Sequence, residues 1–255
     1  MGKILIIPDV HGREFWKEPC KNIDDYEKII FLGDYVAPYL HEGISDKTAL
    51  ETFKEILEFK KVNKDKVVLL LGNHDFTYFQ TWICECRTDY YNIEELRKLY
   101  KDNLDLFDIA WETEINNNRY FLSHAGVKKK WMRKYVNNIL FVWNENTLPK
   151  VDMFNNAFHV AYKENNDSLR DRFELAISIC SYYRGNIYET CGSIVWADAR
   201  EFLKEPREYD NVIFICGHTQ SKNEPILTEG FVDLDVRKAF TLDTESGKIE
   251  EFTEN

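Results

Sequence analysis

The chain has 255 residues, a length that suits one large domain spanning residues 1–255. Hydrophobic residues make up 44% and aromatic residues 15% of the sequence, which allows a substantial core and excludes a disordered chain. The net charge of −11 argues against nucleic acid and anionic membranes as partners.

The start of the sequence predicts no secretion signal. Its apolar run, residues 4–7, is too short for a signal-peptide core, and Asp9 follows closely. No stretch approaches 18 apolar residues, so we expect no membrane-spanning helix. The six cysteines are scattered, which is typical of reduced thiols, although Cys84 and Cys86 leave a zinc knuckle open. We therefore expect a cytoplasmic protein without membrane contact.

Three short apolar runs predict strands of a buried sheet in the first part of the chain. They cover residues 3–9, 28–34 and 66–73, and each is apolar on both faces. Between the last two, residues 45–63 have apolar side chains near helical spacing from Leu50 to Val62, and Ser45 or Asp46 can cap this helix. This order predicts a crossover connection and a largely parallel sheet.

The rest of the chain predicts more strands and at least two helices. Helices are expected at 92–103 and 168–184, and strands at 106–115, 119–126, 211–218, 230–235, 238–244 and 247–252. Turns are expected at Asn116-Asn117-Asn118 and at Glu245-Ser246-Gly247. Together the elements predict a two-layered sandwich of sheets with outer helices.

Five of the expected strands end in polar residues. The five segments are PDVHG (8–12), LGDY (32–35), LGNHD (71–75), LSHAG (122–126) and CGHTQ (216–220), and they hold four of the six histidines. A single Gly-Asp or Gly-His pair is ordinary in turns. Five such ends, nearly all with a glycine that lets the backbone approach a ligand, favour a binding site.

The side chains of these segments match the ligands of divalent metal ions. The candidate ligands are Asp9, His11, Asp34, Asn73, His124 and His218. Asp9 and His11 are two residues apart, so an extended chain can direct both to one face, and the Asp34 carboxylate can bridge two ions. Mixed oxygen and imidazole ligands suit Mn, Fe or Zn. Two ions roughly 3.5–4 Å apart would activate a bridging hydroxide for phosphate-ester hydrolysis.

The order D-x-H, G-D, G-N-H-D, H-A-G and G-H resembles the calcineurin-like metallophosphoesterases. GDYV, SHAG and CGHTQ are similar to the phosphoprotein-phosphatase branch, which includes bacterial and phage phosphatases and the diadenosine tetraphosphatases. Gln220 stands where the wider family often has a second histidine, and VWADAR (195–200) is similar to a segment of the bacterial members. The resemblance covers residue 4 to about 250 and implies a four-layer αββα sandwich of mixed sheets.

The resemblance also implies a role for each strand-end residue. The implied ligands are Asp9 and His11 for the first ion, Asp34 as the bridge, and Asn73, His124 and His218 for the second ion. His74 would protonate the leaving oxygen, a task that needs an imidazole pKa near the working pH. The two divalent ions would be Mn, with Fe, Zn or Mg as alternatives.

Arg200 is the candidate for gripping the substrate phosphate, because a guanidinium matches phosphate through two hydrogen bonds. A surface salt bridge is the alternative role for Arg200. Arg13 and Arg184 are further candidates for the same task.

The second motif departs from the branch, which usually has G-D-x-V-D-R-G where this chain has GDYVAPYLHEG. Ala37 replaces the aspartate that pairs with the acid histidine in relatives, and Pro38 replaces an arginine that grips phosphate. We expect a less well oriented His74, unless Asp75 or Glu42 takes the place of that aspartate. The loop 38–46 could instead bind substrate through Tyr39 or His41, or Ala37 could be an engineered replacement.

Three functions remain open on the sequence. The first is hydrolysis of phosphomonoesters, most plausibly in a phosphorylated protein, and small phosphoesters are possible substrates. The second is hydrolysis of dinucleoside polyphosphates, and the third is phosphate binding without turnover. The basic segment 128–136 meets either an acidic substrate or only solvent. Residues 141–146 and 153–167 are expected over the cleft, with His159 in a structural role.

Overall fold

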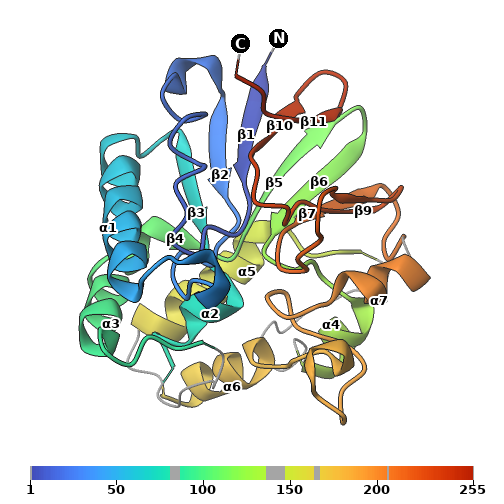
Figure 1. The fold of residues 1–255 in the computed structure, drawn as a ribbon. Helices are drawn as coiled ribbons and strands as arrows, with labels where there is room; N and C mark the ends of the chain where they lie inside the picture. Colours follow the sequence, from blue (N-terminus) through green and yellow to red (C-terminus); the bar gives the residue numbers. More distant parts are fainter. Residues whose placement is uncertain (1, 81–86, 136–146, 164–166, 206, 255) are drawn as a thin grey trace. The chain divides into compact units, whose positions relative to one another are not determined.

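The computed structural model describes residues 2–80, 87–135, 147–163, 167–205 and 207–254 (Figure 1). The chain forms two compact units, Met1–Phe107 with Arg237–Asn255 and, separately, Asp108–Val236. The single domain expected over residues 1–255 stays a prediction. Cys84, Cys86 and the segment 141–146 lie outside the described residues. No helix in the described part of the chain is long and apolar enough to cross a membrane.

The first unit is built on a mixed sheet with the strand order β11-β10-β1-β2-β3-β4. Its strands are β1 (Lys3–Ile7), β2 (Lys28–Phe31), β3 (Val67–Leu70), β4 (Phe107–Asp108), β10 (Phe240–Asp243) and β11 (Ile249–Glu251). β1, β2 and β3 pair in parallel, whereas β10 pairs antiparallel with β1 and β11. This confirms the parallel pairing that the strand–helix–strand order predicts.

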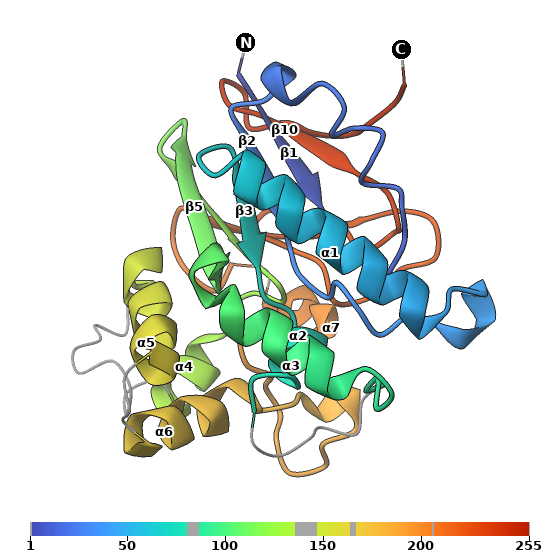
Figure 2. The same cartoon turned by 90° about the vertical axis from the view of Figure 1, so that its left-hand side faces the viewer.

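Helix α1 (Asp46–Val62) connects β2 to β3 and crosses the sheet (Figure 2). Ser45 caps it as expected, since its Oγ accepts a hydrogen bond from the Thr48 amide at 3.1 Å. Phe53 on its buried face stacks on Tyr35 and Tyr100, with ring centroids 5.3 and 4.6 Å apart. Val62 is 81% exposed, so the apolar face ends one turn earlier than its spacing predicts.

Short helices and turns complete the first unit. They are α2 (Asn73–Phe76), α3 (Ile93–Asp102) and the 3-10 turns η1 (Ile23–Asp25), η2 (Leu40–Glu42) and η3 (Leu104–Leu106). The predicted turn before β11 is present, because Gly247 adopts a φ of +75° and its amide donates to the Asp243 carbonyl at 2.9 Å.

The second unit has its own mixed sheet, in the order β5-β6-β7-β9-β8. The strands are β5 (Ala110–Ile115), β6 (Asn118–Ser123), β7 (Val212–Cys216), β8 (Ile226–Leu227) and β9 (Phe231–Asp233). β6, β7 and β9 are parallel, and the β5–β6 hairpin turns through Asn116 and Asn117 at positive φ. Two mixed sheets with helices are the α/β architecture that the sequence predicts.

The helices of the second unit pack on this sheet and on one another. They are α4 (Lys129–Tyr135), α5 (Val151–Lys163), α6 (Asp167–Ile177) and α7 (Ala199–Lys204), with the 3-10 turn η5 (Tyr182–Arg184). α5, which contains most of the segment 153–167, packs on β5 and α6 and buries Phe154 and Phe158. His159 Nε2 lies 3.2 Å from Asp108 Oδ1, a contact that supports its structural role.

Two predicted elements are divided in the structure. The strand expected at 106–115 becomes β4 and β5 in different sheets, because the amides of Ile109 and Ala110 both donate to the Asn155 side chain at the break. The helix expected at 168–184 ends at Ile177, where the Ser178 hydroxyl bonds the Glu174 carbonyl. Serine side chains that bond nearby backbone groups compete with helix continuation, and η5 follows separately.

Candidate metal centre

The carboxyl ends of β1, β2 and β3 carry the first set of predicted site residues. Asp9 and His11 follow β1, Asp34 follows β2, and Asn73 and His74 open α2 directly after β3. Because these strands are parallel neighbours, their ends meet at one edge of the sheet, where α/β folds bind ligands. All five side chains are buried. The first unit therefore brings together the residues that the sequence analysis selected in this part of the chain.

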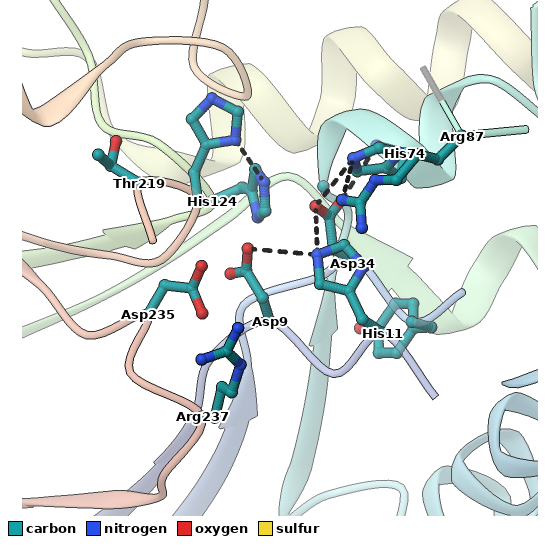
Figure 3. A network of polar contacts seen from close by, with 12 residues as sticks. Asp9, His11, Asp34, His74, Arg87, His124, Thr219, Asp235 and Arg237 are labelled. Atoms are coloured by element: carbon teal, nitrogen blue, oxygen red, sulfur yellow. Dashed lines mark hydrogen bonds and ion pairs between the residues drawn. The ribbon is translucent and has the colours of Figure 1, made fainter. Parts of the chain in front are cut away.

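Figure 3 shows the two histidine rings of this set beside the Asp34 carboxylate. Asp34 Oδ2 lies 3.6 Å from His11 Nε2 and 4.0 Å from His74 Nε2, and His11 Nε2 lies 3.9 Å from Asp9 Oδ2. These distances are too long for hydrogen bonds, and those between His11 and the two carboxylates suit atoms that share an ion. The Val36 carbonyl contacts His11 Nδ1 at 2.9 Å, which directs Nε2 toward the carboxylates.

The protonation state of His11 also suits a metal. Burial lowers the pKa of His11 well below its ordinary value, and the charge of Arg87 lowers it further. The hydrogen bond with the Val36 carbonyl opposes this shift only in part. The ring is therefore neutral, which is the form that binds a metal ion.

The backbone is held in an unusual conformation at two of these residues. His11 has a φ of 47° and Asp34 a φ of 54°, a left-handed region that costs non-glycine residues roughly 1–3 kcal/mol and is found mainly at functional sites. The glycines of the second and third motifs lie where the strand ends touch. A Cβ on Gly72 would lie 2.1 Å from Asp34 Oδ1, and one on Gly33 would lie 2.4 Å from the Gly72 amide.

Asp75 holds the Asp34 loop in place. Its Oδ2 accepts hydrogen bonds from the amides of Asp34 and Gly72, both at 2.7 Å. Its Oδ1 accepts from the Tyr35 amide at 3.2 Å and from the Tyr100 hydroxyl. This fully buried carboxylate is committed to the backbone of the site rather than to the His74 ring.

Glu42, the other proposed carboxylate partner of His74, pairs with arginines instead. It receives two hydrogen bonds from Arg13, at 2.8 and 3.0 Å, and lies 2.7 Å from Arg237 Nε. Burial alone would raise the pKa of Glu42, but the hydrogen bonds and charges of Arg13 and Arg237 hold it below its ordinary value. Arg13 also donates to the Asp9 carbonyl at 3.1 Å, so this cluster fixes the loop 38–46 against the end of β1.

Arg87 is the site residue that the sequence analysis missed. Its Nη2 lies 2.9 Å from His74 Nε2 (Figure 3). Its guanidinium lies 3.6 Å from the centroid of the Tyr39 ring. Nη1 is buried and has no hydrogen-bond partner among the described residues. Arg87 belongs to no motif and follows His74 by thirteen residues, so no local pattern pointed to it.

Tyr39 and His41, the two loop candidates for substrate binding, differ in their surroundings. The Tyr39 ring lies between the Arg87 guanidinium and the edge of His11, whose ring centroid is 5.0 Å away. The His41 side chain is 68% exposed and lies 5.6 Å from the Tyr39 ring. Tyr39 is therefore part of the wall of the site, and His41 lies at its margin.

The second unit contributes a pair of buried histidines. His124 follows β6 and His218 follows β7, two parallel neighbours, and His124 Nε2 lies 3.1 Å from His218 Nδ1. His218 has a φ of 74°, the left-handed conformation also seen at His11 and Asp34. The Trp196 ring stands edge-on to His218 at 5.6 Å. Two imidazoles that direct nitrogens at one point are a typical half of a metal site.

Arg184 and Arg200 share one buried carboxylate in the second unit. Arg200 forms two hydrogen bonds with Asp198, both at 2.9 Å, and stacks on Tyr183. Burial alone would raise the pKa of Asp198, but its hydrogen bonds from Arg200 and the charges of Arg184 and Arg200 hold it below its ordinary value. This is the salt-bridge arrangement considered for Arg200, and its role as a phosphate clamp stays a prediction.

Arg184 is nearer to the histidine pair. Its Nη2 donates to the His218 carbonyl at 2.8 Å and to the Thr219 hydroxyl at 3.0 Å, and its Nε lies 3.2 Å from Asp198. It therefore supports the backbone at His218. Like Arg13, which donates to the Asp9 carbonyl, Arg184 lies beside a predicted ligand.

The donor sets of both units fit divalent metal ions. The first unit offers buried carboxylates, an amide oxygen and neutral imidazole, and the second offers two imidazoles. Mixed oxygen and nitrogen donors of this kind bind Mn, Fe or Zn. Buried donors of this composition can hold metal ions, whereas the polar residues of ordinary turns lie at the surface.

The family model for calcineurin-like phosphoesterases matches residues 2–222. The chain therefore belongs to this family, and it is a metal-dependent phosphoester hydrolase. No curated protein matches the chain.

Of two similar solved structures, the first supports the fold. A serine/threonine phosphatase from Saccharomyces cerevisiae with similarity to human phosphatase PP5 is 13% identical, with a TM-score of 0.50 over 100% of this chain and 80% of that chain. An archaeal phosphodiesterase is also 13% identical, with a TM-score of 0.37 over 98% of both chains. At these identities the likeness concerns architecture alone.

Proposed function

We propose that this protein is a phosphatase that uses two divalent ions to hydrolyse phosphomonoesters, with phosphorylated proteins as its substrates. The observation that carries the proposal is the burial of Asp9, His11 and Asp34 together at the ends of parallel strands, two of these residues having left-handed backbone. Membership of the calcineurin-like phosphoesterases supports the reaction class. A cytoplasmic location, without nucleic acid or membrane partners, belongs to the same proposal.

The proposed ligands are the six residues that the sequence predicts. Asp9 and His11 would hold one ion, Asp34 would bridge, and Asn73, His124 and His218 would hold the other. Mn is the proposed metal, because half of this set is oxygen and half is imidazole, and Fe, Zn or Mg are alternatives. When bound, two such ions supply Lewis-acid activation of water and neutralise the charge of a phosphoryl group.

His74 is the proposed acid for the leaving oxygen. An arginine can only donate hydrogen bonds, so the contact from Arg87 requires an unprotonated Nε2 on His74. In the proposed reaction, the substrate phosphate draws the Arg87 guanidinium away, His74 Nε2 takes up a proton from solvent, and the leaving oxygen then receives that proton.

Arg87 thereby replaces the cation that the second motif lacks at Pro38. Its Nη1, buried without a described partner, is available for a phosphate oxygen. Stacking on Tyr39 keeps the guanidinium plane near the cluster of ligands. Arg13 is committed to Glu42, so among these two arginines Arg87 is better placed to bind substrate directly.

The phosphatase proposal is tested by comparing substrates for the Mn-loaded protein. We expect an aryl phosphate monoester and a phosphoserine peptide to be cleaved faster than an aryl phosphodiester or a diadenosine polyphosphate. His74→Asn should lower kcat by about 10²–10⁴-fold, the usual contribution of a general acid. His159→Asn is the matched control, because this histidine contacts Asp108 outside the metal ligands.

Other results would replace the proposal. Faster cleavage of the diadenosine polyphosphate would favour the dinucleotide hydrolase, for which Ala37 is the supporting feature. No cleavage of any ester by metal-loaded protein, together with tight phosphate binding, would favour a phosphate-binding relative.

The role of Arg87 is tested separately with inorganic phosphate as a competitive inhibitor. The variant Arg87→Met should raise the inhibition constant of phosphate and the KM about tenfold or more. The reason is the loss of a charge-assisted hydrogen bond worth roughly 1.5–3 kcal/mol. Arg87→Lys should recover part of the loss, because it restores the charge without the planar fork. Arg97→Met, on α3, is the control. Unchanged phosphate inhibition in Arg87→Met would remove Arg87 from the substrate site.

A further inference from the structure

The unit Asp108–Val236 contains a cavity of about 750 Å³ between the start of α4, η5 and the end of α7. Six cations line it: Lys128, Lys129, Lys130, Arg133, Lys204 and Arg207. Three carboxylates also line it, so its formal charge is six minus three, or +3, on a chain whose net charge is −11. We call it the cationic cavity. Its volume lies in the range of roughly 300–1,000 Å³ that is usual for ligand pockets.

Two of the three carboxylates are committed to the protein itself. Glu208 is buried, lies 2.7 Å from the Lys128 ammonium and accepts from the Lys129 amide at the start of α4. Glu201 is buried in the capping box of α7 and accepts from the amides of Gly192 and Asp198. These carboxylates form the floor of the cavity and hold its walls together.

Three of the six cations have neutral partners, whereas Lys128 and Arg207 pair with carboxylates. The Lys130 ammonium donates to the Thr190 hydroxyl, and the Lys204 ammonium donates to a tyrosine hydroxyl, that of Tyr183. The Lys129 ammonium lies 5.0 Å from the centroid of an aromatic ring. Hydroxyl groups and rings position an ammonium without cancelling its charge, so these three lysines retain their attraction for an anion.

One wall of the cavity is continuous with the histidine pair of this unit. Tyr182 and Tyr183 line the cavity, and Arg184, the next residue of η5, donates to the His218 carbonyl at 2.8 Å. A chain that occupied the cavity would therefore pass beside a residue that supports a candidate metal ligand.

We propose that the cationic cavity binds an acidic segment of a polypeptide substrate, close in sequence to the phosphorylated residue; this inference rests on the proposed phosphatase function. The lysines come from separate elements, and ammonium groups act as adaptable point charges. That arrangement suits carboxylates spaced along an extended peptide.

Binding is measured first, by fluorescence anisotropy with a labelled, unphosphorylated peptide rich in aspartate and glutamate. The reference peptide has asparagine and glutamine at the same positions. We expect at least tenfold tighter binding of the acidic peptide at low ionic strength, and loss of most of this difference at high salt. Equal affinity for the two peptides would overturn the proposal.

Charge reversal then locates the binding site. The double variant Lys130→Glu/Lys204→Glu should weaken binding of the acidic peptide by about tenfold, because two attractive pairs become repulsive. The variant Lys130→Gln/Lys204→Gln should show a smaller loss of affinity for the acidic peptide. It replaces the charge-reversal variant if circular dichroism shows that charge reversal impairs folding. Lys61→Glu/Lys248→Glu carries the same change in net charge on exposed residues of the first unit and should bind like the wild type.

Two results would overturn the location or the ligand class. Equal weakening in the cavity and control variants would mean that net charge alone is responsible. Tighter binding of a single-stranded oligonucleotide than of the acidic peptide would assign the cavity to nucleic acid instead.

Kinetics separate this inference from the proposed function. The ratio of kcat/KM for an acidic phosphopeptide to kcat/KM for an aryl phosphate should fall about tenfold in the charge-reversal variant. An unchanged ratio would overturn the docking role even if both substrates are hydrolysed. If neither substrate is hydrolysed but the acidic peptide still binds through Lys130 and Lys204, the cavity stands as a binding site and only the phosphatase proposal fails.

Discussion

Replacing Asp75 by asparagine tests how the protein holds the Asp34 loop in place. The carboxylate accepts four hydrogen bonds, from three backbone amides and the Tyr100 hydroxyl, and it is fully buried. An asparagine side chain can accept on only one of its two atoms. The amide group will face Tyr100, whose hydroxyl can rotate to accept, and the Tyr35 amide then loses its partner.

The magnitude follows from those bonds. One buried N–H without a partner costs roughly 1–3 kcal/mol, and two charge-assisted bonds that become neutral lose roughly half their strength. We expect Asp75→Asn to lower the free energy of unfolding by about 3 kcal/mol. Tyr100→Phe, which removes one hydroxyl, should cost about 1 kcal/mol.

Urea unfolding of the metal-free protein measures both values. In the double variant Asp75→Asn/Tyr100→Phe, the losses of unfolding free energy should not add. We expect a coupling energy of at least about 0.5 kcal/mol, because the two side chains share a hydrogen bond. Asp65→Asn, an exposed control, should change stability by less than about 0.5 kcal/mol. Affinity for Mn should fall about tenfold in Asp75→Asn, since Asp34 loses its support. Wild-type stability in Asp75→Asn, or strictly additive losses, would refute the reasoning.

Three further predictions concern packing, pH and metal. Gly72→Ala should lower the free energy of unfolding by more than about 2 kcal/mol, because the added Cβ would collide with the Asp34 loop. In the control Gly43→Ala the added Cβ meets nothing within 4 Å, so the loss should be only the roughly 1 kcal/mol of a positive φ. The midpoints of urea unfolding measure both losses. The pKa of Glu42 is depressed in the folded protein, so its contribution is complete above the ordinary value of 4.5 and is lost as the pH falls through the folded-state value. The stability gap between wild type and Glu42→Gln, about 2 kcal/mol at pH 7, should therefore narrow below pH 4.5, and a constant gap across that range would contradict the pairing with Arg13. Adding Mn at about 100 times its dissociation constant should stabilise the protein by about 2.7 kcal/mol, measured by thermal melting and reversed by a chelator; no response to any divalent ion would argue against the metal site.

Sequence patterns located the ligand candidates because each lies immediately after a short, strongly apolar strand. The burial of β1, β2 and β3 on both faces requires parallel neighbours, and parallel neighbours bring Asp9, Asp34 and Asn73 to one edge. The Ser45 cap and the Asn116–Asn117 turn could also be predicted from the sequence, since caps and tight turns depend on a few adjacent residues.

The partners of the catalytic candidates could not be predicted from the sequence in the same way. The sequence raised Asp75 or Glu42 as a partner of His74, but Asp75 bonds the backbone of the Asp34 loop and Glu42 bonds Arg13. Arg87, which contacts His74, lies outside every motif. Such pairings depend on the path of a loop through space, and hydrophobic periodicity contains no information about that path.

The amino-acid order by itself determined the strand ends, their glycines and the set of oxygen and imidazole donors, because each depends on side-chain chemistry and on spacings of a few residues. Only the tertiary structure decided which donors are buried together, which arginine contacts His74, and that six cations of separate elements line one cavity. The physical reason is that charge pairing and burial depend on distances in the folded chain, and residues far apart in sequence acquire those distances only when the sheets and helices pack.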